Sequence, residues 1–356
     1  MTVPRSMFGI QLTGHGGPER LVANPAIPVP APGPGEVLVR VLAAGVNNTD
    51  VNTRIGWYAR EVRAGTGGGA GVEVEAGGWA GALSFPRIQG ADLCGVVVAH
   101  GAGVSAPELG ARVTCPTNQP EPTPANPVAI RVIGSEYDGA FAQFCVVPAH
   151  QLHDVTRSPL TDIEIAAMPC AYGTAENLLD RARVATGERV LVTGASGGVG
   201  MAAVQLAKLR GATVTALAGA AKQQAVRAAG ADDVLDRGAV PAPASFEAVI
   251  DLVGGPGWGG LIDALKPGGR YSVAGAIAGP IVEADLRTIY LGDLTLFGCT
   301  YQSPEVFGRL VAHINAGALR PLVSKTYPLG DIARAQEDFV AKRYPGKLVL
   351  LPPEVQ

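Results

Sequence analysis

The arrangement of apolar and polar positions divides the chain into two parts. In the first part, apolar and β-branched segments lie between stretches rich in Gly or Pro, which is typical of short strands. Strands are expected at residues 36–43, 93–99 and 141–147. The first 150 residues or so are therefore predicted to be rich in β structure.

The pattern changes at about residue 161. Helical spacing runs over residues 161–183, and short apolar strands then alternate with helices. Strands are expected at 189–193, 213–217, 234–235, 248–252 and 271–274, and helices at 198–209 and 222–229. This alternation favours an α/β fold with a doubly wound parallel sheet. Beyond residue 300 we expect a helix at 307–316 and a closing strand at 347–351 that could rejoin the first part.

Two segments differ from the rest in composition. Residues 64–82 contain many glycines without a repeat period, which predicts a mobile loop or flap. Residues 116–128 are rich in Pro and are expected to form another loop.

The strongest local motif is the glycine-rich segment 194–200, GASGGVG. It follows a predicted strand and precedes a predicted helix, which is the context in which such a turn binds the diphosphate of a dinucleotide. Backbone N–H groups and the helix dipole would meet the phosphates there. The residues expected to line this cradle are Ser196, Gly197, Gly198 and Val199. Ala195 stands where the strict pattern needs Gly, and a tight turn without a ligand is the alternative.

The next strand indicates which nucleotide binds. Enzymes that take NAD usually carry Asp or Glu about 20 residues beyond the turn, where it binds the ribose 2′-hydroxyl. Here no acidic residue occurs between Glu188 and Asp232, while Lys222 lies in this stretch and Arg237 follows the third strand. The sequence therefore predicts NADPH, with both cations near its 2′-phosphate. Solvated surface charge is the alternative for Lys222 and Arg237.

Composition narrows the class of partner and compartment. The 28 Lys and Arg and the 31 Asp and Glu give a net charge of −3, which argues against nucleic acid and anionic membrane as partners. No stretch offers the ~18 apolar residues of a membrane span, and we find no signal peptide. Five scattered cysteines suit free thiols in the cytoplasm.

Ordered motifs along nearly the whole chain resemble the medium-chain dehydrogenase/reductase superfamily, and within it the zinc-free quinone oxidoreductase-like branch. The matching segments include PGPGEVLVRVLAAGVNNTD (32–50), PRIQGADLCGVVVAHGAGV (86–104), MPCAYGTAENLL (168–179), GERVLVTGASGGVGMAAVQLAKLRGATV (187–214) and PGKLVLLP (345–352). So many motifs in the same order are far more specific than the glycine-rich turn alone.

The resemblance implies a Rossmann domain inserted into a GroES-like catalytic domain built on a distorted β-barrel. The expected boundaries are 1–158 and 301–356 for the catalytic domain and 159–300 for the NADP(H)-binding domain. The resemblance also places Asn47 and Thr174 at the nicotinamide end, where they would bind the carboxamide or the substrate oxygen. Further cofactor contacts that it implies are Val253, Gly275 and Lys347. It implies a homodimer through the edge of the Rossmann sheet, at about residues 294–301.

The ligands of the superfamily's catalytic zinc are largely replaced in this chain. The three ligand positions hold Asn47, Ala91 and Cys170, so that two of the three strong ligands are missing. Asp92 and Cys170 alone would make a poor tetrahedral site. We therefore expect no metal, and Cys170 is expected to be a small buried residue.

Without a metal, hydride transfer to an already electron-poor carbon remains feasible. The expected activity is NADPH-dependent reduction of a quinone or an α,β-unsaturated carbonyl, with Asn47, Tyr58 and Thr174 as catalytic candidates. Tyr58 would donate a hydrogen bond or a proton, and packing is the alternative for it. An alcohol or carbonyl dehydrogenase and a non-catalytic nucleotide-binding relative remain as alternative functions.

Overall fold

The computed structural model describes residues 3–66, 79 and 81–355, and the chain divides into two compact units. Unit 1 contains Met1–Val62, Gly69–Cys170 and Ser303–Gln356, and unit 2 contains Arg63–Gly68 and Ala171–Gln302. The interrupted order expected from the sequence is present, because unit 2 is inserted into unit 1. Most of the predicted flap, residues 67–78 and 80, lies outside the described residues.

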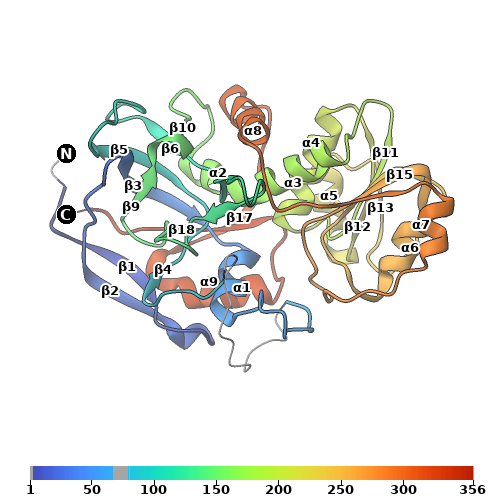
Figure 1. Ribbon diagram of the computed structural model, residues 1–356, viewed down its shortest axis with the longest axis horizontal. Helices are drawn as coiled ribbons and strands as arrows, with labels where there is room; N and C mark the ends of the chain where they lie inside the picture. Colours follow the sequence, from blue (N-terminus) through green and yellow to red (C-terminus); the bar gives the residue numbers. More distant parts are fainter. Residues whose placement is uncertain (1–2, 67–78, 80, 356) are drawn as a thin grey trace. The chain divides into compact units, whose positions relative to one another are not determined.

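Mainly antiparallel sheets form the body of unit 1, and β17 and β18 in the largest of them pair parallel (Figure 1). Among the described residues, its largest sheet runs in the order β10 (His153–Asp154), β6 (Arg112–Thr114), β5 (Cys94–His100), β3 (Glu36–Gly45), β18 (Lys347–Leu351) and β17 (Val323–Pro328), with β9 (Phe144–Pro148) also paired to β3. A second sheet contains β2 (Leu21–Pro28), β1 (Ser6–Leu12) and β4 (Arg87–Ile88), and a pair contains β7 (Asn118–Pro120) and β8 (Ile130–Val132).

The closing strand at 347–351 is confirmed. As β18 it pairs antiparallel with β3, so that the end of the chain completes the sheet formed by its beginning. The segment 116–128 is not wholly loop, because β7 lies within it. The strand expected at 141–147 starts at Phe144, because Phe141 instead bonds to the backbone of Gln89.

Short helices complete unit 1. They are α1 (Asn48–Ile55), α2 (Asp162–Ala166), α8 (Pro304–Ala316) and α9 (Ile332–Val340). At the end of α1, Gly56 adopts a φ of 71°, a left-handed conformation that glycine tolerates. The helical spacing over 161–183 corresponds to two helices, since the chain breaks between α2 and α3 (Pro169–Arg181), where Pro169 opens the second helix.

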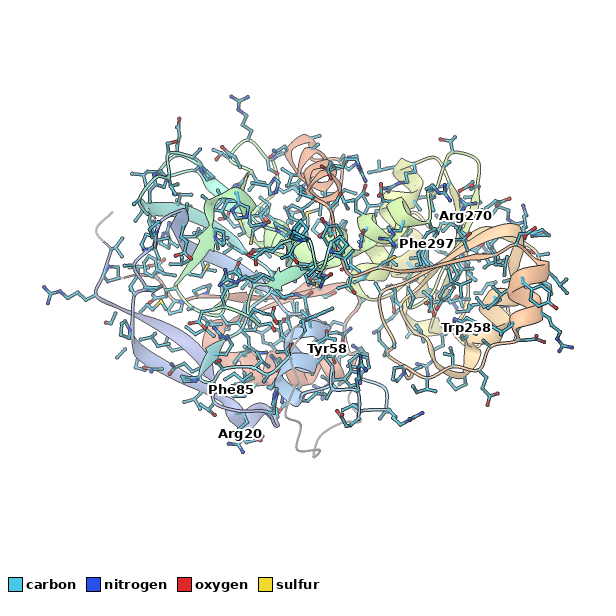
Figure 2. The ribbon with its side chains drawn as sticks, in the orientation of Figure 1. Arg20, Tyr58, Phe85, Trp258, Arg270 and Phe297 are labelled. Carbon is cyan, nitrogen blue, oxygen red and sulfur yellow. The ribbon has the colours of Figure 1, made fainter. Side chains whose placement is uncertain are left out.

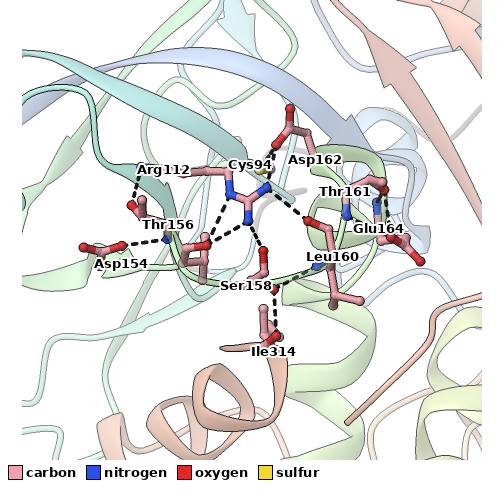
Figure 3. A network of polar contacts seen from close by, with 11 residues as sticks. Cys94, Arg112, Asp154, Thr156, Ser158, Leu160, Thr161, Asp162, Glu164 and Ile314 are labelled. Atoms are coloured by element: carbon pink, nitrogen blue, oxygen red, sulfur yellow. Dashed lines mark hydrogen bonds and ion pairs between the residues drawn. The ribbon is translucent and has the colours of Figure 1, made fainter. Parts of the chain in front are cut away.

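The segment that leads into α2 is held by Arg112 (Figure 3). Its guanidinium donates to the backbone oxygens of Val155, Ser158 and Leu160 and to the carboxylate of Asp162. These bonds and the packing of α2 on β3 and β5 place residues 159–170 in unit 1. The unit boundaries therefore fall at 170/171 and 302/303, whereas the sequence placed them at 158/159 and 300/301.

Unit 2 is a doubly wound parallel sheet. Its strands run in the order β13 (Asp233–Asp236), β12 (Thr213–Ala218), β11 (Arg189–Val192), β14 (Phe246–Asp251), β15 (Leu265–Val273) and β16 (Thr295–Gly298). Helix α4 (Gly198–Leu209) packs on β11 and β12, α5 (Gln223–Ala228) on β12 and β13, and α6 (Trp258–Asp263) on β15 (Figure 1). The order reverses at β11, between β12 and β14, and such a switch point is where open α/β sheets bind ligands.

Candidate functional site

The glycine-rich turn of unit 2 joins β11 to α4. Gly194 adopts a φ of 56°, and the N–H of Ala195 donates to the carbonyl of Leu217 at 3.1 Å, which ties the turn to β12. Gly197 is the N-cap of α4 and has no side chain to bond the first N–H groups of the helix. Those N–H groups and the positive end of the helix dipole therefore suit a phosphate.

Two glycines of this turn have different physical roles. A Cβ on Gly200 would lie 2.4 Å from the carbonyl oxygen of Gly194 and 2.5 Å from the Cα of Ala195, so Gly200 is required for packing. A Cβ on Gly197 would meet only the oxygen of Gly194, at 3.5 Å, which is an ordinary contact. Gly197 is exposed and extended, so the fold itself does not require glycine there.

A buried carboxylate supports the neighbouring loop, and sequence reasoning missed it. Asp251, at the end of β14, accepts bonds from the Thr193 hydroxyl at 2.6 Å, the Tyr271 hydroxyl at 2.6 Å and the Val253 N–H at 2.9 Å. It thereby joins the ends of β11, β14 and β15 beside the predicted contact Val253. The one available signal was an acidic residue closing an apolar strand, which on its own is ambiguous.

Close packing continues beyond β15. A Cβ on Gly275 would lie 2.8 Å from the carbonyl oxygen of Leu252, so the loop after β15 lies against the end of β14. The N–H of Ala278 donates to the carbonyl of Val253 at 2.8 Å. The predicted contacts Val253 and Gly275 therefore belong to one loop cluster in unit 2.

The end of β12 provides no carboxylate from its own strand. The strand ends at Ala218, and Gly219 precedes a short 3-10 helix that contains Lys222. A Cβ on Gly219 would contact Cδ of Arg237 at 3.8 Å, so the Arg237 side chain lies beside this strand end. Partial burial lowers the pKa of Lys222 below its ordinary value. Of the two predicted cations, Arg237 therefore lies beside the end of β12, and Lys222 lies in the short helix that follows this strand.

One carboxylate does lie on the adjacent strand. Asp236 is in register with Ala218, and its Oδ1 accepts the N–H of Gly238 at 3.0 Å. The sequence argument considered only the segment up to Asp232 and did not weigh this residue. Thr174, the remaining predicted residue of unit 2, is half-buried on α3.

In unit 1, three predicted or neighbouring residues form a buried polar cluster. Lys347 and Asp92 make an ion pair with an Nζ–Oδ2 distance of 2.9 Å, and their side chains are 3% and 0% exposed. Lys347 also donates to Asn47 Oδ1 and, at 3.1 Å, to the carbonyl of Val46. Asn47 Nδ2 donates to Asp92 Oδ2 at 2.9 Å. The predicted residues Asn47 and Lys347 thus lie together, although 300 positions separate them.

The residues of this cluster do not suit the catalytic zinc found in other members of the superfamily that the sequence resembles. Asp92 Oδ2 is taken by Lys347 and Asn47, and Oδ1 accepts the N–H of Cys170 at 2.6 Å. Burial raises the pKa of the Cys170 thiol to about 12, which disfavours the thiolate that a metal requires. Among the residues that the structure describes, no group of three His, Cys, Asp or Glu could hold a metal ion.

Asp50 stabilises the start of α1 from inside the same unit. Its Oδ2 accepts the N–H of Asn47 at 2.8 Å, and its Oδ1 accepts the N–H of Ala91 at 3.2 Å. Burial raises the pKa of Asp50 to about 7, and the Asp92 carboxylate adds to the rise, while the two backbone bonds and Lys347 oppose it. These contacts hold the loop that leads into α1.

Tyr58, which is labelled in Figure 2, follows α1 and packs against two other aromatic rings. The ring of Trp79 lies 4.4 Å from that of Tyr58 with an interplanar angle of 38°, and Trp57 packs edge-on at 5.6 Å. The indole N–H of Trp79 donates to the Thr49 hydroxyl at 2.8 Å. Burial raises the pKa of Tyr58 well above its ordinary value, although hydrogen bonds with Thr49 and Asn52 oppose the rise. Sequence reasoning missed both Thr49 and the position of Trp79.

Two family models match the chain. Residues 33–157 match the alcohol dehydrogenase GroES-like domain, and residues 198–316 match the zinc-binding dehydrogenase family. Asn47 lies in the first matched region, and the second begins at Gly198, the first residue of α4.

Complete relatives cover nearly the whole chain. A quinone oxidoreductase from Rattus norvegicus is 29% identical over 373 residues and covers 98% of this chain and 99% of its own. The crystal structure of a putative alcohol dehydrogenase from Sinorhizobium meliloti is 44% identical with a TM-score of 0.88, covering 99% and 98%. A cobalt- and zinc-bound thermostable alcohol dehydrogenase from Pyrobaculum aerophilum is 31% identical with a TM-score of 0.82, covering 97% and 99%. With its inserted parallel sheet and its GroES-like unit, this chain belongs to the medium-chain dehydrogenase/reductase superfamily of oxidoreductases.

Proposed function

We propose that this oxidoreductase uses NADPH to reduce a quinone or an α,β-unsaturated carbonyl without a metal. The observation that carries the proposal is the buried Lys347–Asp92 ion pair, which occupies the carboxylate beside Cys170 and leaves no donor set suited to zinc. A substrate that is already electron-poor needs no Lewis acid. The similarity to quinone oxidoreductases supports the same substrate class.

The choice of NADPH rests on the end of β12. Ala218 and Gly219 leave room there, and the cations Lys222 and Arg237 lie in the turns that follow β12 and β13. A 2′-phosphate would be attracted by these charges, whereas a ribose hydroxyl would find no carboxylate on β12 itself.

Different residues would bind the diphosphate and the nicotinamide of the nucleotide. The bound nucleotide supplies a hydride to the acceptor. The N–H groups at the start of α4, with Ser196 to Val199, bind the diphosphate, and Val253 and Gly275 line the same loop cluster. Asn47 and Thr174 hold the nicotinamide carboxamide or the substrate oxygen, and each stays a prediction.

Tyr58 is the proposed proton source. Because burial raises its pKa, the phenol stays protonated at neutral pH and can donate to an oxygen on which negative charge develops. The Trp57, Tyr58 and Trp79 rings form a largely apolar wall, which suits a planar acceptor such as a quinone.

An alcohol dehydrogenase is the second candidate, because the Pyrobaculum aerophilum structure is an alcohol dehydrogenase with bound cobalt and zinc. The two functions are separated by one set of assays on the purified protein. We expect oxidation of NADPH above background with at least one of a panel of quinones and enones, well under one zinc per chain, and no loss of activity with a chelator. Stoichiometric zinc that activity depends on, with turnover of alcohols, would establish the second candidate instead.

We also propose a homodimer that forms through the β16 edge of the unit 2 sheet. Strand β16 ends the described sheet, and exposed apolar side chains gather on it and on α7 (Leu286–Leu291). They are Leu286, Tyr290, Leu291 and Leu296. An unpaired strand edge next to apolar side chains is typical of a surface that pairs with another chain. The cytoplasmic location stays as predicted from the cysteines.

A further inference from the structure

The side-chain amide of Asn47 lies between two opposite charges. Its Oδ1 accepts a bond from the Lys347 ammonium, and its Nδ2 donates to Asp92 Oδ2 at 2.9 Å. The ammonium and the carboxylate also bond to each other at 2.9 Å. The three side chains therefore form a closed triangle in the interior of unit 1.

The charges determine which way this amide points. The oxygen and nitrogen of an Asn amide have nearly the same shape, so a hydrogen-bond network usually decides between the two orientations. A rotated Asn47 would place its NH₂ group against the ammonium and its oxygen against the carboxylate. Both contacts would be repulsive, and burial strengthens such repulsion.

The remaining bonds of the triangle fix its position. Asp92 Oδ1 accepts the N–H of Cys170 at 2.6 Å, and Lys347 Nζ donates to the carbonyl of Val46 at 3.1 Å. The cluster thus joins the end of β3, residue 92, the start of α3 and β18. Since these segments are distant in sequence, the orientation of Asn47 depends on the completed fold.

All three N–H donors of the Lys347 ammonium are engaged within the protein, so none is available to a phosphate. An ammonium group carries three N–H donors, and here they are taken by Val46 O, Asn47 Oδ1 and Asp92 Oδ2. The side chain is also 3% exposed. These facts disagree with the expectation, drawn from the family resemblance, that Lys347 binds the cofactor directly.

Asn47, in contrast, keeps one weakly engaged donor. Its second N–H faces the carbonyl of Gly45 at 3.5 Å, the outer limit of a hydrogen bond. We propose that Lys347, with Asp92, is a positioning residue that locks the amide of Asn47 so that this N–H is presented to the oxygen of the nicotinamide or of the acceptor. This inference rests on the proposed function, because it explains how a residue of that site is held.

A double-mutant cycle between Lys347 and Asn47 tests the inference. We expect Lys347→Met and Asn47→Ala each to lower kcat at least about tenfold, because each removes the oriented N–H. If Lys347 acts through Asn47, adding Lys347→Met to Asn47→Ala should lower kcat little further. Calorimetry should find that Lys347→Met weakens NADPH binding by no more than Asn47→Ala does, with the two Kd values within about twofold of each other. Lys325→Met, a lysine on the adjacent strand β17, is the matched control and should change neither quantity.

Two results would overturn the inference. A Kd of NADPH for Lys347→Met at least tenfold above that for Asn47→Ala would show that the ammonium binds the cofactor itself. Losses in kcat that multiply in the double variant would show that Lys347 acts independently of Asn47. If the unpaired Asp92 prevents Lys347→Met from folding, the neutral pair Lys347→Met/Asp92→Asn replaces it in both measurements.

A failure of the proposed function is distinguishable from a failure of the inference. If the wild type reduces no member of the quinone and enone panel, the proposed function fails. The inference is then decided by NADPH calorimetry and by a crystal structure of Lys347→Met. A Kd no weaker than that of Asn47→Ala with a displaced Asn47 amide supports it, and a Kd at least tenfold weaker than that of Asn47→Ala or an unmoved amide overturns it.

Discussion

Two glycines in the turn after β11 differ in whether the fold itself requires glycine. Gly200 is required by the fold, because a Cβ there would collide with the backbone of Gly194 and Ala195. Gly197 has room for a side chain as far as the protein is concerned. A requirement for glycine at 197 would therefore come from the ligand, and substitution separates the two roles.

Gly197→Val should fold with nearly the stability of the wild type and bind NADPH at least about tenfold more weakly, because its side chain would occupy the place of the diphosphate. Gly200→Ala is the matched comparison and should lower the free energy of unfolding, since its Cβ has no space. Calorimetry and urea unfolding measure the two effects. Unchanged NADPH affinity in a folded Gly197→Val protein would remove the nucleotide from this turn.

The proposed preference for NADPH would also depend on single residues. A charge-assisted bond from Lys222 to the phosphate should contribute about 1.5–3 kcal/mol, which corresponds to roughly a ten- to hundredfold preference for NADPH over NADH. Lys222→Ala should erode kcat/KM for NADPH and leave that for NADH nearly unchanged. Ala218→Asp should go further, because it repels the phosphate and offers the ribose hydroxyl an acceptor.

Asp236→Asn is the control that this prediction needs, because Asp236 is the carboxylate in register with Ala218. If Asp236 bound a ribose hydroxyl, the wild type would prefer NADH and Asp236→Asn would lose that preference. Equal losses with both cofactors in Lys222→Ala would likewise contradict the assignment of NADPH.

At the scale of elements, helix α1 depends on a buried acid. Asp50 bonds the N–H groups of Asn47 and Ala91, and its pKa is raised to about 7 mainly by burial. Between its unfolded pKa of 3.8 and about 7, the native state holds a proton that the unfolded chain has released. The contribution of Asp50 to stability is therefore fully present below about pH 4 and is lost as the pH rises through about 7.

We accordingly expect the free energy of unfolding of the wild type to fall between pH 5 and pH 8 by about 2 kcal/mol more than that of Asp50→Asn. The comparison of slopes matters, because Asp50→Asn also loses a bond at every pH. Asp285→Asn is the control, since Asp285 is exposed and its pKa is lowered by Arg287. Urea unfolding followed by circular dichroism at several pH values tests this, and parallel curves for the wild type and Asp50→Asn would contradict it.

At the scale of the whole molecule, the predicted site residues fall in both compact units. Unit 2 contains the glycine-rich turn with Lys222 and Arg237, and unit 1 contains Asn47, Tyr58 and the buried ion pair of Lys347 and Asp92. No helix in the part of the chain that the structure describes is long and apolar enough to cross a membrane. We propose that the exposed apolar side chains of α7 and β16 contact a second copy of the chain.

The double variant Leu291→Glu/Leu296→Lys should shift the protein from dimer to monomer, because it places charges on the proposed interface. Sedimentation equilibrium or light scattering at micromolar concentration measures the shift. Leu209→Lys is the control, because it also places a charge at an exposed leucine, but on α4 and outside the proposed interface. It should leave the dimer intact. A wild type that is already monomeric at these concentrations would refute the dimer.

Local patterns in the sequence determined the larger part of the fold. The alternation of short strands with helices, the turn at 194–200 and the closing strand at 347–351 all appear in the structure, because each depends on residues close together in the chain. The strands β1 and β2 and the helix α9 were not anticipated. Their apolar positions have a clear meaning only when paired or packed against distant segments.

In the candidate site, too, some residues could be predicted from local sequence and others only from the tertiary structure. The glycine-rich turn was predictable because its glycines lie close together in the sequence, between a strand and a helix that local patterns also predicted. Only the tertiary structure decided the environment of Asn47, Asp92 and Lys347, and the contact of Trp79 with Thr49. A buried charge is defined by its partner, and the partner of Asp92 lies 255 residues away. No spacing rule connects such residues, because only the completed packing of β3, α3 and β18 brings them together.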